Sequence, residues 1–302
     1  MTYPDCGSYR SSPAAETSWR AGLVLVLTMW VAGCASASLD GDGSLSSYAD
    51  LKSSDGVLAK SKLYVSSEAV SAARTVKIVP ATFSPKAQVN GVTNEQRRLI
   101  GNAINRSLCG NLSDKFTLVS SGDADLTIYT HVSQMTPTDE TAVAASKGGA
   151  IAKTILLPGV PVPTPRIPIG LGSLSVEAEA RGHNGQQVAA MIWGRGANFM
   201  SGSARVSTAG DAYDLASAFG DDFSTMLITG KSPFGEMPRT PSLERVEVMA
   251  GGAPKYASCE AFGRELGVAG AIGGAIGVPP EWNDKGGTDG AVSAEQAPSN
   301  VR

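Results

Sequence analysis

Few side chains in this chain are of the types that carry out chemistry. The sequence holds only two histidines, His131 and His183. Neither has an aspartate and a serine near it in the arrangement of a nucleophile triad, and no G-x-S-x-G motif occurs. Glu177 and Glu179 stand two residues apart, which would suit paired carboxylates on one strand face, but alternating exposed acids on a sheet edge explain the pair better. We therefore predict that the chain has no catalytic residue and is not an enzyme.

Two further patterns are similar to chemical sites only superficially. Residues 148–154 contain two glycines, a lysine and a threonine, but Ala152 occupies a position where a phosphate-binding loop has glycine. Asp221 and Asp222 are expected on the solvated surface of a helix. The histidines and cysteines lack the spacing of metal ligands. We expect no metal and no other cofactor.

Composition narrows the class of protein. The chain has 302 residues, of which 42% are hydrophobic and 18% charged, and this excludes both a disordered chain and a multi-pass membrane protein. The formal net charge is −3. A protein that neutralises many phosphates carries a basic surface, so we expect no nucleic-acid partner.

The strongest signal lies at the N-terminus. Residues 21–34 form an apolar run behind Arg20 that is too short to span a bilayer but typical of a secretory signal. The run ends in Val-Ala-Gly-Cys at residues 31–34, which resembles the lipobox of bacterial lipoproteins. By that resemblance, residues 1–33 are a signal peptide and Cys34 becomes the first mature residue, which carries the lipid. An uncleaved N-terminal anchor or a chance apolar helix is the alternative.

The residue after the lipobox favours the outer membrane. Ala35 follows Cys34, whereas an aspartate there is similar to an inner-membrane retention signal. Two or three acyl chains such as palmitate are a sufficient tether, because each buried methylene contributes roughly 0.8 kcal/mol. We therefore expect a protein of the bacterial cell envelope that is anchored by lipid to the outer membrane and faces the periplasm.

Export also bears on the cysteines. Cys6 leaves with the signal peptide and Cys34 takes the lipid, so only Cys109 and Cys259 remain as thiols. Two leftover cysteines in an oxidising compartment most often pair, and we predict a disulfide between them. Two buried free thiols are the alternative.

The mature chain divides into three parts by composition. Residues 34–60 are rich in Ser, Gly, Asp and Ala and are predicted to form a lipidated flexible tether. Residues 61–232 are predicted to fold as one domain with its own core. Residues 233–302 are a Gly/Pro-rich extension that we expect to be partly disordered. Three larger side chains of the tether would allow it to dock on the body instead: Leu45, Tyr48 and Leu51.

Periodicity predicts the elements of the folded part. Thr93 and Gln96 have the spacing of a capping box and begin a helix with one apolar face. His131 falls on the polar side of a predicted strand, while His183 lies at a predicted turn. Three strands flank the helix: residues 76–79, 116–119 and 124–134.

The clearest predicted feature is a β-hairpin. Alternating apolar residues lead to an Asn-Gly pair at 184–185, which is preferred in two-residue type I′ turns. A turn of this length places Ala178 opposite Met191 and Val176 opposite Trp193 on the core face. That face belongs to the core of the domain.

A final helix begins near Asp211 and stops at Gly230. Two helices that cover a mostly antiparallel sheet predict an α+β fold, specifically a two-layer sandwich.

Two apolar segments have no place in this scheme. Residues 142–157 predict a helix, which five prolines between 158 and 168 end. We interpret residues 141–172 either as packed on their own domain or as a lid that binds a partner or the membrane. Residues 266–278 contain small residues four apart, a spacing that allows helices to approach closely. Packing within the chain is favoured there over an oligomer contact or membrane insertion.

Several of these segments together resemble one family. The chain is similar to an uncharacterised family of proteobacterial lipoproteins, known as domain of unknown function 3313, over about residues 44–232. Cys259 and the Pro-Pro-Glu-Trp of residues 279–282 are similar to the tail of its longer members. The segments that carry the resemblance are the lipobox, residues 44–51, residues 165–172 and residues 176–180.

The resemblance implies location and fold rather than an activity. We expect an outer-membrane-anchored periplasmic lipoprotein, not an enzyme, that binds or scaffolds a protein or other component of the envelope. The alternative is an oligomeric accessory lipoprotein of a secretion or transport complex that touches membrane through residues 142–172 or 266–278. The order of elements is similar to that of lipoproteins in such complexes, which is an analogy of fold alone.

Overall fold

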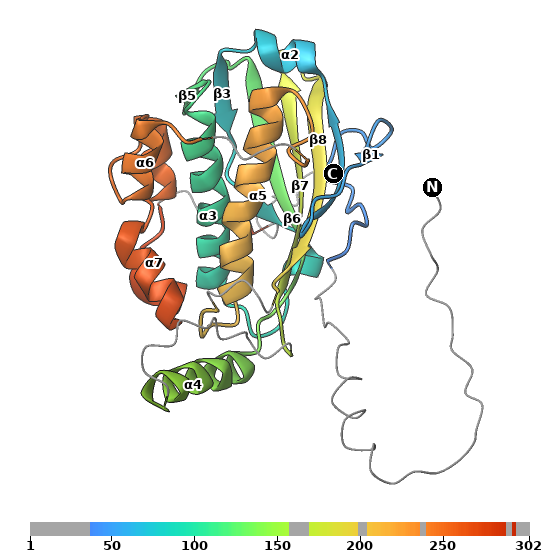
Figure 1. The fold of residues 1–302 in the computed structure, drawn as a ribbon. Helices are drawn as coiled ribbons and strands as arrows, with labels where there is room; N and C mark the ends of the chain where they lie inside the picture. Colours follow the sequence, from blue (N-terminus) through green and yellow to red (C-terminus); the bar gives the residue numbers. More distant parts are fainter. Residues whose placement is uncertain (1–36, 157–168, 199–203, 236–239, 288–291, 294–302) are drawn as a thin grey trace, which may run out of the picture. The chain divides into compact units, whose positions relative to one another are not determined.

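The structure is a computed structural model. It describes residues 37–156, 169–198, 204–235, 240–287 and 292–293 (Figure 1). Cys34 and the predicted signal peptide lie outside these residues, as do the prolines between 158 and 168.

The described residues form an α+β fold around one mixed sheet of nine strands. The order is β1-β2-β8-β7-β6-β3-β5, and β4 pairs with both β6 and β9. In this spatial order, the neighbouring strands β1, β2, β8, β7 and β6 pair antiparallel. β3 runs parallel to both of its neighbours, β6 and β5. The strands are β1 (Lys52–Ser53), β2 (Lys60–Val65), β3 (Thr75–Ile78), β4 (Thr82–Phe83), β5 (Thr117–Val119), β6 (Leu126–Thr136), β7 (Ser173–Gly182), β8 (Gln187–Gly196) and β9 (Val292–Ser293).

The hairpin of β7 and β8 has the register that the sequence predicts. Val176 lies opposite Trp193, and Ala178 lies opposite Met191. All four side chains are fully buried in the core.

The turn of this hairpin is longer than predicted. The Gly185 N–H donates to the Gly182 carbonyl and the Gly182 N–H donates to the Gln186 carbonyl, both at 2.8 Å. This is the pattern of a three-residue loop with a bulge, in which Gly185 has φ 76°. A second irregularity between Ala180 and Arg181 shifts the register by one residue and so restores the predicted pairs.

Two long helices, α3 (Asn94–Leu112) and α5 (Gly210–Thr229), cover one face of the sheet (Figure 1). The predicted capping box is confirmed, because Thr93 accepts from the Gln96 N–H at 3.1 Å and Gln96 accepts from the Thr93 N–H at 2.8 Å. α5 ends at Gly230, which has φ 68°. The predicted fold class, an α+β sandwich with two covering helices, is confirmed.

Aromatic side chains join α5 to the sheet. The ring of Trp193 meets the edge of Phe219 with 5.7 Å between centroids, and Phe219 stacks on Phe223 at 5.8 Å. Gly220 allows α3 and α5 to approach, because a Cβ atom there would overlap the side chain of Ser107. The burial of these rings fixes α5 on the core face.

The opposite face of the sheet is covered by residues 37–51, which we call the N-terminal clasp. Leu45 is only 7% exposed and packs on Ala190 and Ile192. Residues 52–60 continue from the clasp into β1 and β2. The prediction of a flexible tether is therefore wrong for residues 37–60, and the alternative of docking is confirmed. Two further side chains of the clasp pack there: Tyr48 and Leu51.

The C-terminal extension folds back onto α3, where Cys109 and Cys259 form the predicted disulfide with 5.8 Å between Cα atoms. Residues 240–287 are thus part of the folded body, while most of the expected disordered tail lies outside the described residues. The predicted helix at 142–157 is present as α4. The remaining helices are α2 (Ser67–Ala72), η1 (Pro85–Ala87), α4 (Glu140–Leu156), α6 (Leu243–Met249), η2 (Ala257–Phe262), α7 (Gly267–Ile276) and α8 (Pro280–Asn283).

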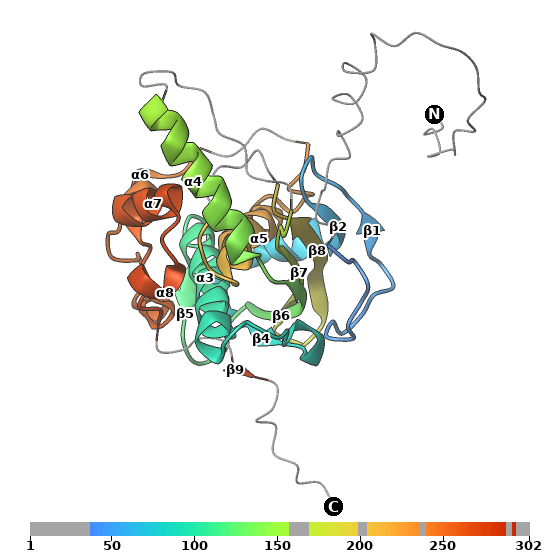
Figure 2. The ribbon, with the colours of Figure 1, turned by 90° about the horizontal axis from the view of Figure 1, so that it is seen from below.

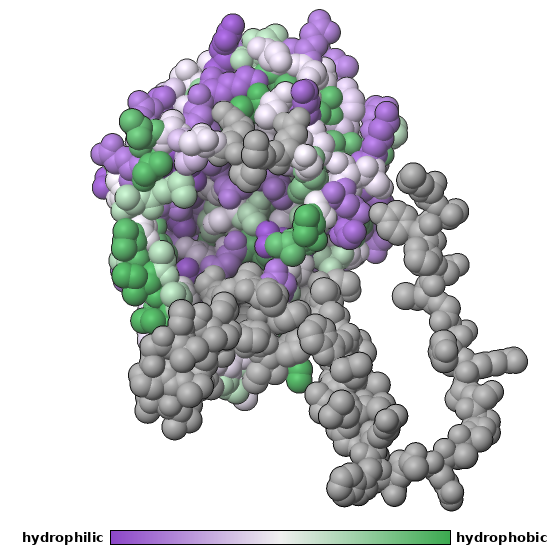
Figure 3. Space-filling model, viewed as in Figure 1, coloured by the Kyte–Doolittle hydropathy of each residue, from purple (hydrophilic) through white to green (hydrophobic). Residues whose placement is uncertain are grey.

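The small residues of α7 pack within the chain, as predicted. Gly270, Gly273 and Gly274 are buried, and a Cβ atom at Gly274 would press on Arg205. The larger side chains of α7 point outward and continue an apolar band over α6 (Figure 3). The exposed members of this band are Leu243, Val246, Met249, Val268, Ile272 and Ile276.

Candidate functional site

The acidic and histidine candidates come together on the clasp-covered face of the sheet. His131 in β6 lies directly opposite Glu177 in β7, and Tyr129 lies opposite Glu179. The side chain of Glu177 is 0% exposed and that of Glu179 is 1% exposed. The interpretation as exposed acids on an edge is therefore wrong, because β7 is an internal strand between β6 and β8 and the clasp closes over it. His183 is exposed in the hairpin loop, four residues after Glu179, and is not part of this cluster.

Glu177 holds the clasp by hydrogen bonds at three of its residues. Its carboxylate accepts from the Asp42 N–H, from the Ser44 hydroxyl at 2.6 Å and N–H at 3.3 Å, and from the Tyr48 hydroxyl at 2.5 Å. Hydrogen bonds to an ionised acceptor are stronger than neutral ones. One buried carboxylate thereby orders three residues of a segment more than 120 positions away in sequence.

Glu179 holds the clasp at Ser46. Its carboxylate accepts from the Ser46 N–H at 3.0 Å, from the Ser46 hydroxyl at 2.5 Å and from Gln187 at 2.7 Å, while the Arg181 guanidinium pairs with the other oxygen. Burial by itself raises the pKa of Glu179, but these hydrogen bonds outweigh it and leave the pKa below its ordinary value. Glu179 is therefore ionised at neutral pH.

A second polar cluster surrounds Asp42, which is itself a residue of the clasp. The Lys86 ammonium lies 2.9 Å from the Asp42 carboxylate, and His131 Nε2 lies 3.4 Å from it. Partial burial by itself raises the pKa of Asp42. Lys86 and neighbouring groups lower this pKa by more than burial raises it, so the net shift is downward. The other ring nitrogen of His131 is bonded to the Thr82 hydroxyl at 2.8 Å.

These contacts determine what the cluster can do chemically. A cavity of about 170 Å³ remains beside Thr82, His131 and Glu177. Glu177 and Glu179 both accept hydrogen bonds from the clasp, and Glu179 is also bonded to Gln187 and Arg181. The arrangement is suited to holding a chain segment.

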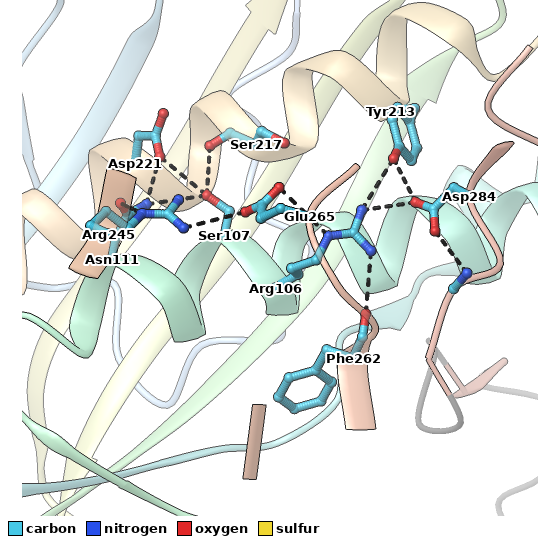
Figure 4. Close-up of polar contacts among 11 residues, drawn as sticks. Arg106, Ser107, Asn111, Tyr213, Ser217, Asp221, Arg245, Phe262, Glu265 and Asp284 are labelled. Carbon is cyan, nitrogen blue, oxygen red and sulfur yellow. Dashed lines mark hydrogen bonds and ion pairs between the residues drawn. The ribbon is translucent and has the colours of Figure 1, made fainter. Parts of the chain in front are cut away.

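A larger cavity of about 740 Å³ lies on the other side of the molecule, between α3, α5 and the extension. Figure 3 looks onto this side, and Figure 4 shows the polar network at the cavity wall. Arg106 pairs with Asp284 at 2.8 Å, and both contact the Tyr213 hydroxyl. Arg106 also donates to the Phe262 carbonyl at 3.3 Å. The network ties the extension to α3 and α5.

The same wall continues toward the other end of α3. Arg245 donates to Asn111 at 3.1 Å, and its guanidinium lies 3.5 Å from Glu265. Asp221 accepts from Asn111 at 2.6 Å and from Ser107 at 3.2 Å (Figure 4). Each arginine is thus engaged with a carboxylate and an uncharged partner, as buried charges require.

The prediction of a solvated helix surface holds for Asp221, which is exposed, whereas Asp222 is half-buried. Its carboxylate accepts from the indole N–H of the buried Trp193 at 2.7 Å. Burial raises the pKa of Asp222 to about 6, and the neighbouring Asp221 adds to the increase. This pair forms an acidic wall of the larger cavity.

Sequence reasoning missed the second network. Arg106, Asn102 and Asn105 are buried on α3. In the sequence they continue the polar side of an amphipathic helix, so nothing in the local pattern shows that a further layer covers them. For the clasp, the signal was the matching period of two in Ser44-x-Ser46 and Glu177-x-Glu179.

Two general features of the described residues limit the kinds of site. No three His, Cys, Asp or Glu side chains in this part of the chain gather as a metal site would require. None of its helices is both long and apolar enough to cross a membrane.

Comparison with known proteins identifies the family. The model of the family described as "Protein of unknown function (DUF3313)" matches residues 40–223, and the chain belongs to this family. The match begins in the clasp and ends within α5, so the extension lies beyond it. No curated protein matches the chain.

Solved structures that are similar include the PelC dodecamer from Paraburkholderia phytofirmans. It is 9% identical, with a TM-score of 0.34, and the match covers 58% of this chain and 100% of that chain. A single-substitution variant of the same dodecamer is 10% identical, with a TM-score of 0.31 and coverage of 59% and 95%.

Proposed function

We propose that this protein is a lipoprotein, anchored through Cys34 to the periplasmic leaflet of the bacterial outer membrane, that scaffolds an envelope partner. The observation that carries the proposal is the position of the clasp. The described residues begin at Ala37, three positions after the cysteine of the lipobox-like sequence, and the clasp that they form packs on the sheet. The disulfide of Cys109 and Cys259 supports export, because such bonds persist in oxidising compartments.

A scaffolding role is supported by the use that the structure makes of its reactive side chains. Glu177, Glu179 and His131 are the residues with the chemistry of an acid–base site, and all three are engaged beside the clasp. Their hydrogen bonds hold chain segments together. We therefore propose a binding role and no enzymatic activity.

Recovery of partners from cells tests the proposal. The lipidated protein and a Cys34→Ala variant are crosslinked in intact cells and purified through the same C-terminal tag. We expect envelope proteins to be enriched with the lipidated form and to be lost with the variant. Equal recovery from both forms, or no envelope protein with either, would count against the proposal.

A second candidate is supported by the apolar band on α6 and α7. Leu243 is 89% exposed and Ile276 is 67% exposed, so this surface is suited to contacts between subunits of an oligomeric secretion or transport accessory. Light scattering after size exclusion in mild detergent separates the candidates. A strict monomer would exclude the oligomeric accessory.

A further inference from the structure

The clasp gives the folded body a defined direction relative to its N-terminus. Ser175 near the start of β7 donates to the Ser38 carbonyl at 2.8 Å, and Ser46 lies farther along the same strand at Glu179. The clasp thus runs parallel to β7 from its first residues. The clasp begins where β7 starts and where β6 and β8 end, and Ala37 lies against Gly194 of β8.

The same end of the sheet carries α4. This helix begins at Glu140, directly after β6 ends, and crosses that end of the molecule (Figure 2). Lys147 of α4 donates to the carbonyl of Ala275 at 2.6 Å, so the C-terminus of α7 lies there as well. We call this surface the α4 end. Two of its large apolar side chains are exposed: Ile169 at 66% and Ile276 at 67%.

The opposite end of the sheet is polar. It holds the loop before β6 and the hairpin turn, where Asp123, His183 and Asn184 are exposed. The eleven residues of β6 separate the two ends by about 35 Å, at about 3.3 Å per residue.

Chain length restricts where a lipid on Cys34 can be. Ala37 is three positions after Cys34, and three steps of fully extended chain span at most about 11 Å. A flexible tether over residues 35–60 would instead reach about 90 Å. The clasp therefore removes nearly all of the reach that the sequence suggests.

We propose that the α4 end is a membrane-contacting surface that lies on the phospholipid leaflet, with Ile169 and Ile276 at the level of the headgroups. This inference rests on the proposed lipidation of Cys34 and adds an orientation to it. Exposed apolar side chains gain free energy by entering the boundary between headgroups and acyl chains. The polar end then faces the periplasm.

Contact quenching of a fluorophore tests the orientation. Full-length lipidated protein carries one labelled cysteine, from either Ile169→Cys or Asp123→Cys, and is placed in phosphatidylethanolamine–phosphatidylglycerol vesicles that contain a headgroup nitroxide lipid. The native disulfide keeps Cys109 and Cys259 from reacting with the label. We expect loss of most of the fluorescence at position 169 and of little at position 123. Ile276→Cys is a second reporter in case the first substitution disturbs the loop.

The outcomes separate the orientation from the anchor. If the protein floats with the vesicles but both positions are quenched equally, or position 123 more, the orientation is wrong and the anchor stands. If the protein with wild-type Cys34 fails to float, as is expected of Cys34→Ala, both the proposed function and the orientation are wrong. In a lipidated Glu177→Gln, Glu179→Gln double variant, quenching at position 169 should decrease toward that at position 123. Undiminished quenching there would contradict the role of the clasp.

Discussion

Replacement of Glu177 by glutamine should loosen the N-terminal clasp. Glu177 accepts four hydrogen bonds from the clasp, and a bond to a charged acceptor contributes about 1 kcal/mol more than a bond to a neutral one. Four such losses amount to about 4 kcal/mol. The neutral amide costs less to bury than the carboxylate, which offsets roughly half of this. We expect a net loss of about 2 kcal/mol in docking free energy, or about a 30-fold shift toward the undocked segment.

Hydrogen–deuterium exchange measures this shift directly. The N–H groups of Asp42 and Ser44 are bonded to Glu177, so their exchange should accelerate about 30-fold in Glu177→Gln. Exchange in the central residues of β7 should not change. The matched control is Glu247→Gln, which neutralises an exposed carboxylate on α6. Unchanged exchange in the clasp, or equal acceleration throughout β7, would refute the reasoning.

Three further predictions concern charge and covalent structure. The folded-state pKa of Glu179 lies below its unfolded value, so its contribution to stability is present above about pH 4.3 and is lost as the pH falls through the folded pKa; exchange of the Ser46 N–H should show this loss in the wild type and not in Glu179→Gln. The raised pKa of Asp222, about 6, means that the free energy of unfolding should fall as the pH rises from about 4 through 6. Urea denaturation should show a flatter pH profile for Asp222→Asn, and an identical profile would contradict the assignment. The double variant Cys109→Ala, Cys259→Ala lacks the cross-link that restricts the unfolded chain, so its free energy of unfolding should be lower by up to about 5 kcal/mol. An unchanged urea midpoint would show that the bond is absent from the purified protein.

The predicted features that the structure confirms are those with a local physical cause. The capping box of Thr93 and Gln96 satisfies N–H groups three residues apart, and Gly230 ends α5 because it takes a positive φ at little cost. The hairpin register follows from the two-residue period of β7 and β8, which only one alignment keeps buried. The loop has one residue more than predicted, and a bulge compensates for it.

The features that sequence reasoning missed depend on distant partners. The composition of residues 34–60 is that of a linker, but residues 37–51 dock on the sheet through the two buried carboxylates of β7 and the apolar contact of Leu45. A strand with alternating acids has the same pattern at a sheet edge as under a covering segment. The pairing of Arg106 with Asp284 spans 178 positions, and no short-range pattern encodes such a contact.

The identity of the mature N-terminus tests the central claim most directly. Mass spectrometry of the protein extracted from cell membranes should show that residues 1–33 are absent and that the N-terminal peptide begins at Cys34 with a diacylglyceryl group on its sulfur. A free Cys34 thiol in a membrane-derived protein, or a chain that retains its first 33 residues, would contradict the account.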